Sequence, residues 1–232
     1  MFHSLTLFKR RQSDVSSEVS VFFQYILKGI PKIGSEKVEK IFSETGLRCN
    51  WWRSAGSITS EQIKAKLNSD NLYLHLEHYQ EVPPGSDRAF CEDTPFISTT
   101  AGTAVEDTAA GKLYVHDAFW EAAMFATERF NSDGWIFYGY VYVLGKPAIE
   151  LQEFAEEVRN FHLYARFLRH RREGEITAKI EIPSVRLQRA EFYRGSKLSE
   201  QLMRGQRPKP VKVLLNDTYC PPERYANVLG RM

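Results

Sequence analysis

Two carboxylates stand two residues apart in the string Glu173-Gly174-Glu175, just ahead of a segment that alternates apolar and polar residues. In a β-strand, residues i and i+2 face the same side, so both carboxylates can point into one cleft. Like charges at this spacing raise the pKa of one carboxyl group, because the two carboxylates repel each other. Such a pair is therefore expected where a cationic ligand reduces the repulsion or where catalysis uses it. The ordinary alternative is a solvated pair beside Arg171 and Arg172.

Two further groups of polar residues could act with this pair. Ser98, Thr99 and Thr100 follow a short apolar run, and their hydroxyl groups could orient a carboxylate on a neighbouring strand. Arg53 follows two tryptophans in a segment expected to be a strand, where a rigid guanidinium could clamp a pyrophosphate with two hydrogen bonds. Each also has an ordinary explanation, namely strand-to-loop chemistry for the hydroxyls and an arginine covering an aromatic ring for Arg53.

The elements that must position these residues form a mixed α and β pattern. Residues 71–79 either alternate or are locally helical, and helices are expected at 116–130, capped by Asp117, and at 150–168. The expected strands are 95–98, 135–144, 175–183, 185–194 and 211–215.

The N-terminal part is expected to be helical. Apolar residues recur at three- to four-residue spacing from Val15 to Leu27, and a short second helix is expected at 35–42. The sequence therefore predicts a helical extension at residues 1–46 and a second domain at residues 47–232, with a wrapping C-terminal tail.

Composition limits the class of protein. The chain has 232 residues, 43% of them apolar, and a formal net charge of +2, so it can bury a core and carries no strong charge bias toward nucleic acid. Cys49, Cys91 and Cys220 are too few and too scattered for a disulfide framework, and no metal-ligand spacing is present. No apolar run approaches the roughly 18 residues of a membrane span, and no Sec-type signal is seen. Function is therefore expected to come from a site.

In this order, Arg53, Ser98-Thr99-Thr100 and Glu173-x-Glu175 resemble the arginine, Ser-Thr-Ser and Glu-x-Glu signature of the cholera-toxin-like mono-ADP-ribosyltransferases. The two glutamates stand at the family's distance from Ile182-Pro183. Further similar strings are WWRSAGSITSEQIK, Leu76-Glu77-His78, YGYVYVL and CPPERY. The resemblance covers residues 47–226. Residues 1–46 have no counterpart in it, so residues 1–40 are predicted to be dispensable for NAD cleavage. Arg10 and Arg11 are an alternative first motif.

The resemblance implies an α+β fold with a split antiparallel β-sandwich around an NAD cleft, and a reaction that moves ADP-ribose from NAD and releases nicotinamide without a metal. Arg53 would bind the NAD phosphates, with Ser98, Thr99, Thr100, His78 and Glu175 completing the dinucleotide site. Ser98 would hold Glu175, and Glu175 would stabilise the oxocarbenium-like transition state. Glu173 would activate the acceptor, with an arginine favoured.

Two departures from the family pattern bear on the acceptor. The middle motif ends in threonine, which keeps its hydroxyl group. The segment before Glu173 is long and carries five arginines, and an aromatic acceptor-recognition residue is expected there. The arginines are Arg159, Arg166, Arg169, Arg171 and Arg172, and the aromatic candidates are Phe161, Tyr164 and Phe167.

The resemblance also implies partners and a place of action. The partners would be NAD and an acceptor protein in a target cell, reached by a secreted or translocated effector. The alternatives are an NAD glycohydrolase, which would use water, and a nucleic-acid-directed transferase, which the arginine cluster and a hairpin-like segment at 27–42 favour slightly. Glu173 and the near-zero net charge count against nucleic acid.

Overall fold

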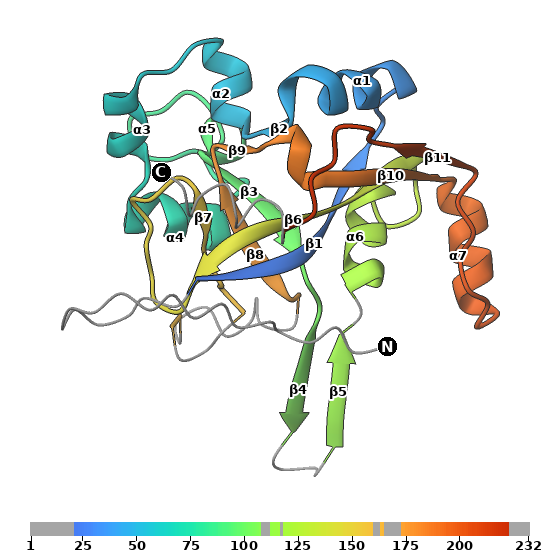
Figure 1. Ribbon diagram of the computed structural model, residues 1–232. Helices are drawn as coiled ribbons and strands as arrows, with labels where there is room; N and C mark the ends of the chain where they lie inside the picture. The colour runs from blue at the N-terminus through green and yellow to red at the C-terminus, as the bar shows by residue number, and fades with distance from the viewer. Residues whose placement is uncertain (1–20, 108–111, 117, 160–162, 165–172, 223–232) are drawn as a thin grey trace, which may run out of the picture.

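The computed structural model describes residues 21–107, 112–116, 118–159, 163–164 and 173–222, and these form an α+β fold (Figure 1). Within them, a main sheet of seven strands has the order β11-β10-β6-β1-β3-β8, with β7 pairing parallel to β6. Its strands are β1 (Val21–Pro31), β3 (Phe96–Thr100), β6 (Gly134–Leu144), β7 (Phe154–Ala155), β8 (Glu175–Lys179), β10 (Leu187–Tyr193) and β11 (Lys212–Leu215). Two small sheets pair β2 (Leu47–Arg48) with β9 (Glu181–Ile182), and β4 (Thr103–Asp107) with β5 (Lys112–His116).

The extent of pairing between neighbouring strands of the main sheet falls between β1 and β3. Strand β1 pairs with β6 along its whole length, from Val21 opposite Leu144 to Pro31 opposite Gly134. Between β1 and β3, by contrast, the described pairing is Leu27 opposite Thr100. The sheet therefore opens where β1 leaves β3, beside the hydroxyl run of β3.

The helix predicted through residues 14–46 is wrong over Val21–Pro31, which is the central strand β1. Both faces of this strand contact protein, so apolar residues occur on both faces, and their spacing imitates that of a helix. The second short helix is confirmed as α1 (Ser35–Lys40), which continues into the π-helical turn η1 (Ile41–Thr45). Residues 1–20 lie outside the described residues.

Four helices connect β2 to β3: α2 (Asn50–Ala55), α3 (Ser60–Lys66), α4 (Ser69–Glu77) and α5 (Phe90–Asp93). The strand expected around Trp51 and Arg53 is wrong, because these residues belong to α2, which is capped by the Cys49 sulfur. Helix α4 settles the ambiguous segment 71–79 as helical, and Asn68 caps its first turn.

Helix α6 (Ala118–Ala126) packs directly on β1 and confirms the centre of the helix expected at 116–130. The expected ends are wrong, because His116 belongs to β5 and residues 127–130 form turns. The contact needs a glycine in the strand, because a Cβ atom at Gly29 would lie 2.1 Å from the Ala122 carbonyl oxygen. Alanines at 122, 123 and 126 keep this face of α6 small and buried. The expected cap, Asp117, lies outside the described residues.

The helix expected at 150–168 is wrong in the part that the structure describes. There the chain forms the short strand β7, and Glu156 is buried in an ion pair 2.6 Å from Lys179 Nζ of β8. The same ammonium group donates to the carbonyl oxygens of Ala148 and Leu151, and the Tyr164 hydroxyl donates to Glu156. These polar contacts fix the segment 148–156 to β8.

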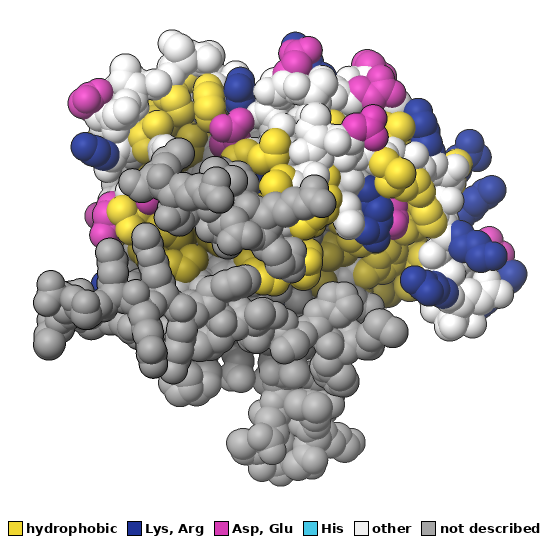
Figure 2. Space-filling view, in the orientation of Figure 1, with side chains coloured by type: hydrophobic (Ala, Val, Ile, Leu, Met, Phe, Trp, Pro, Cys, Tyr) yellow, Lys and Arg dark blue, Asp and Glu magenta, His cyan; other side chains and the backbone are white. Residues whose placement is uncertain are grey.

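The C-terminal strands agree with the sequence. Strand β6 confirms 135–144, β10 confirms 185–194 and β11 confirms 211–215; the segment 175–183 forms β8 and β9, separated at Ile180, whose φ is +61°. The 3-10 turn η3 (Ser184–Arg186) leads into β10, and α7 (Gly195–Met203) follows it. Figure 2 shows Lys and Arg side chains gathered over α7 and the adjoining sheet edge. The exposed basic residues of this region are Arg194, Lys197, Arg204, Arg207, Lys209 and Lys212.

None of the described helices is both long enough and apolar enough to cross a bilayer.

Candidate active site

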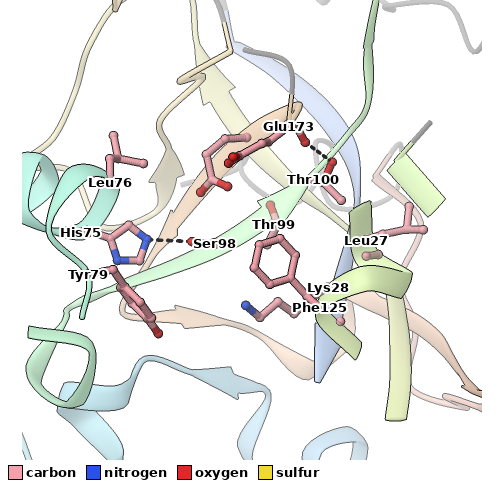
Figure 3. Close-up of a pocket in the computed structure, with 13 residues that line it drawn as sticks. Leu27, Lys28, His75, Leu76, Tyr79, Ser98, Thr99, Thr100, Phe125 and Glu173 are labelled. Atoms are coloured by element: carbon pink, nitrogen blue, oxygen red, sulfur yellow. Dashed lines mark hydrogen bonds between the residues drawn. The ribbon is translucent and has the colours of Figure 1, made fainter. Parts of the chain in front are cut away.

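A pocket lies where β1, β3 and β8 meet the helices α4 and α6 (Figure 3). Its volume is about 230 Å³. Its apolar wall comes from Leu27, Leu76, Tyr79, Ala122 and Phe125, and its ionisable side chains are Lys28, His75, Tyr79, Glu173 and Glu175. We call this the inner pocket. It brings together both glutamates and all three hydroxyl residues predicted from the sequence.

Glu175 is the first residue of β8 and is buried, with 7% of its surface exposed. The Thr177 hydroxyl, two residues along the same face of the strand, donates to Glu175 Oε1 at 2.8 Å. The preceding turn needs a glycine, because Gly174 has a φ of +66° and a Cβ atom there would lie 2.7 Å from the Gly102 nitrogen. This close approach brings Glu173, which lines the same pocket, to the end of β3.

The hydroxyl run of β3 ties this strand to its surroundings. Thr99 donates to the Ile176 carbonyl oxygen at 2.5 Å, and Thr100 donates to the Glu173 carbonyl oxygen at 2.7 Å. The Ser98 oxygen lies 3.0 Å from His75 Nε2, while His75 Nδ1 lies 2.9 Å from the Thr94 oxygen. Thr99 and Thr100 thus hold the backbone of the glutamate segment, and a buried histidine orients Ser98.

The histidine beside Ser98 differs from the predicted one. His78 contacts the Tyr73 hydroxyl and Glu81, and it is absent from the described lining of the pocket. His75, one turn earlier on α4, is buried and lines the pocket. A signal was present in the sequence, because His75 lies on the same helical face as the apolar residues Leu72 and Leu76.

Lys28 is a site residue that the sequence reasoning missed, because the segment was assigned to a helix. It projects from the central strand β1 into the inner pocket (Figure 3). Burial lowers the pKa of the Lys28 ammonium, and the charge of Arg53 lowers it further, while the negative charge of Glu175 acts in the opposite direction. The run Phe22-Phe23-Gln24-Tyr25-Ile26 was the available signal, since aromatic and β-branched residues favour strands.

A second, outer pocket of about 490 Å³ adjoins the first and shares five lining residues with it: Lys28, Gly29, His75, Tyr79 and Ser98. Its lining carries five cationic side chains, Lys28, Lys37, Lys40, Arg48 and Arg53, and no acidic one among the described residues. The Arg48 guanidinium lies 4.1 Å from the centre of the Trp52 ring. The two pockets therefore form one cleft with carboxylates at its inner end and cations at its outer end.

Arg53 belongs to the outer pocket. It is exposed on α2 and donates to the Asn50 side-chain oxygen. Lys28, in contrast, lines both pockets, and the charge of the Glu175 carboxylate acts to raise its pKa against the larger effect of burial. Lys28 of β1 and Arg53 of α2 thus lie one after the other along the cleft, from the inner pocket to the outer pocket.

Only some of the residues expected to recognise the acceptor belong to the described part of the chain. Phe161, Phe167, Arg166, Arg169, Arg171 and Arg172 lie outside the described residues. Tyr164 is buried and donates to Glu156. Arg159 donates to Glu157, to the Gly102 carbonyl oxygen and to Gln24, so it anchors the segment that precedes the glutamates.

The arrangement can bind an elongated anion along the outer pocket and present its inner end to two carboxylates. Cations on four elements, β1, α1, β2 and α2, can neutralise phosphates, and a buried carboxylate can stabilise positive charge that develops on a bound sugar. Within the described part of the chain, no group of three or more His, Cys, Asp or Glu side chains could hold a metal ion.

No family model matches the chain, and no curated protein matches it. The solved structure of EcPltA is similar over 86% of this chain and 87% of that chain, with 14% sequence identity and a TM-score of 0.43.

Proposed function

We propose that this protein is a mono-ADP-ribosyltransferase that transfers ADP-ribose from NAD to a protein side chain, with arginine favoured, and releases nicotinamide. The observation that carries the proposal is the cleft itself. Two carboxylates two residues apart share the inner pocket, and five cations line the adjoining outer pocket. NAD has the matching shape, with a nicotinamide ribose at one end of an anionic pyrophosphate.

The charges of the cleft set the direction in which NAD would lie. The nicotinamide ribose would occupy the inner pocket beside Glu175, and the pyrophosphate would cross Lys28 toward Arg53. Lys28 takes the position nearest the reacting sugar, so it is proposed to be a phosphate ligand in addition to the predicted Arg53. The larger outer pocket would hold the adenosine, beside the Arg48 guanidinium that covers one face of the Trp52 ring.

In the reaction, the bond between the nicotinamide nitrogen and the ribose C1′ breaks, and nicotinamide leaves with the bonding electron pair. Glu175 stabilises the positive charge that develops at C1′, as carboxylates do in glycoside hydrolysis. Thr177 and the Ser98–His75 pair keep the polar groups around Glu175 in place. Glu173 accepts a proton from the acceptor nitrogen, which forms the new bond to C1′.

The proposed function also implies how the sheet is divided around NAD and what role the protein has. The opening between β1 and β3 would divide the sheet into the two halves of an ADP-ribosyltransferase-like split sandwich, with NAD between them. Because Lys28 belongs to β1, the catalytic unit would begin no later than this strand. The protein would act as a toxin or effector on an acceptor protein in a target cell.

Incubation with NAD labelled in its adenylate half tests the proposal. Glu175→Gln should lower nicotinamide release by roughly 100-fold or more, because it removes charge stabilisation needed in the transition state. Glu173→Gln should abolish label transfer to protein and leave measurable nicotinamide release, since only the acceptor step uses this carboxylate. Both substitutions conserve volume, and circular dichroism would verify the fold.

Three outcomes would contradict parts of the proposal. Wild-type protein that releases nicotinamide in a cell lysate without labelling protein would be an NAD glycohydrolase. Label on nucleic acid would retain the NAD site and overturn the protein acceptor. Undiminished nicotinamide release by Glu175→Gln would remove the assignment of the central carboxylate.

A further inference from the structure

One aromatic ring lies open at the mouth of the inner pocket. Phe125 of α6 is 59% exposed and lines the pocket together with Glu173 (Figure 3). Its place is fixed by the backbone, because Gly29 allows α6 to rest on β1 at a distance that no other residue would permit. An exposed phenylalanine held on a rigid helix beside a carboxylate offers a flat apolar face to a ligand.

A second carboxylate stands on the same side of this helix. Glu121 lies one turn before Phe125, so the two side chains occupy the same helical face. The pKa of Glu121 is raised, first by its burial and then by the negative charge of Glu173. Glu121 is absent from the described lining of both pockets, so its link to Glu173 is electrostatic and not a contact. A cation bound near both carboxylates would reduce the repulsion between them.

We propose that Phe125, Glu121 and Glu173 form an acceptor subsite that takes a planar guanidinium group. This inference rests on the proposed transferase function and names the residues that select its acceptor. A guanidinium stacks on an aromatic face and forms paired hydrogen bonds to carboxylates, and it does both at once because it is flat. The subsite is distinct from the predicted aromatic candidates of residues 161–167, since it is built on α6.

The chemistry of the subsite disfavours the other acceptors. A nucleic acid could stack a base on Phe125, but its phosphates would approach two carboxylates. A lysine-like ammonium would gain from the charges but lacks the flat fork that uses the ring and the carboxylates together. In the transfer step, a guanidinium nitrogen would bond to ribose C1′, and its proton would pass to Glu173.

The test uses small acceptors with the full-length protein. Labelled NAD is supplied with either agmatine, which carries a guanidinium, or 1,4-diaminobutane, which carries an ammonium on the same chain. Wild-type protein should label agmatine at least about tenfold faster than the diamine. For Phe125→Ala, the ratio of agmatine labelling to nicotinamide release should fall about tenfold, whereas Phe125→Trp should retain the ratio. Glu121→Gln should raise the KM for agmatine about threefold to tenfold.

Trp120→Ala is the matched control. Trp120 is also an exposed aromatic residue of α6, 43% exposed, but its ring packs edge-on against Phe130, away from Phe125, and it is absent from the described lining of both pockets. This variant should keep the wild-type ratio and the wild-type KM for agmatine.

The possible failures are separable. If wild-type protein releases nicotinamide and the Phe125→Ala ratio is unchanged, the subsite is wrong and the NAD site stands. Equal labelling of agmatine and the diamine, or label on nucleic acid, also overturns the subsite. Wild-type protein that releases no nicotinamide overturns the proposed function and the subsite with it.

Discussion

Lys28 places an ammonium group, and not a guanidinium, between the two pockets. A lysine in a partly buried site changes its protonation with pH, whereas arginine stays charged at any accessible pH. Burial and the positive charge of Arg53 both favour the neutral amine, and the Glu175 carboxylate opposes them. The cation available to an NAD phosphate is therefore sensitive to pH.

This sensitivity predicts a pH-dependent affinity for NAD. Because the pKa of Lys28 is lowered, its charge is present at lower pH and is lost as the pH rises through the lowered pKa, below the ordinary lysine value of about 10.4. The KM for NAD in nicotinamide release should therefore rise with pH in wild-type protein. In Lys28→Arg, the KM should stay flat over the same range. A KM that rises equally in both proteins would assign the effect to another group.

At the residue scale, the sequence predicted the glutamates and the serine correctly as members of one pocket but not every partner. Glu173, Glu175 and Ser98 line one pocket, but Glu173 lies in the turn before β8 and not in the strand as expected, so the turn at Gly174 brings it there. His78 was preferred over His75 because a motif string gave no information on which face of a helix points inward. Lys28 was missed because its strand was assigned to a helix.

The central strand β1 explains that error in physical terms. The spacing of apolar residues distinguishes a helix from a strand with one buried face. It does not distinguish a helix from a strand that is covered on both faces, because apolar residues then occur without a two-residue alternation. The pairing of β1 with β6, more than a hundred residues further along the chain, selects the strand over the helix that the spacing of the apolar residues suggested. In contrast, β6 was predictable, because β-branched and aromatic residues dominate it and no proline interrupts it.

The close contact between α6 and β1 gives a prediction about stability. In Gly29→Ala, the new Cβ atom would meet the Ala122 carbonyl oxygen at 2.1 Å, so the helix must move away from the strand. The free energy of unfolding, measured with urea, should fall by about 1–3 kcal/mol. Gly85→Ala is the comparison, because no atom lies within 4 Å of its Cβ position. That variant should lose only about 1 kcal/mol for its positive φ, and an equal loss in the two would contradict the packing argument.

The buried ion pair between β8 and the segment 148–156 gives a second prediction. Lys179→Met leaves Glu156 as a buried charge without this ammonium partner, and should lower the free energy of unfolding by about 3–5 kcal/mol. Adding Glu156→Gln removes the remaining charge and should recover part of the loss. If the loss of stability in the double variant equals the sum of the losses in Lys179→Met and Glu156→Gln measured separately, the two side chains contribute independently and are not coupled.

For the whole molecule, the place of β1 reverses one expectation from the sequence. Residues 1–40 were expected to be dispensable for NAD cleavage, but this stretch contains the strand that joins β6 to β3 and that carries Lys28. A deletion through residue 31 should abolish cooperative unfolding, because β6 loses its partner along eleven residues. The matched comparison is a deletion through residue 20, which leaves β1 intact. A folded, NAD-cleaving protein without residues 1–31 would show that another segment replaces this strand.

The five residues shared by the two pockets also determine how two substrates would meet. They form a boundary across the cleft, with the cations of α1 and α2 on one side and Phe125 of α6 on the other. A dinucleotide and an acceptor would therefore approach from opposite sides, and neither would have to vacate the cleft before the other arrived. Steady-state kinetics should then be sequential, with a ternary complex, so that double-reciprocal plots at several agmatine concentrations intersect. Parallel lines would instead reveal that nicotinamide departs before the acceptor binds, and that the chain itself carries the ADP-ribose in between.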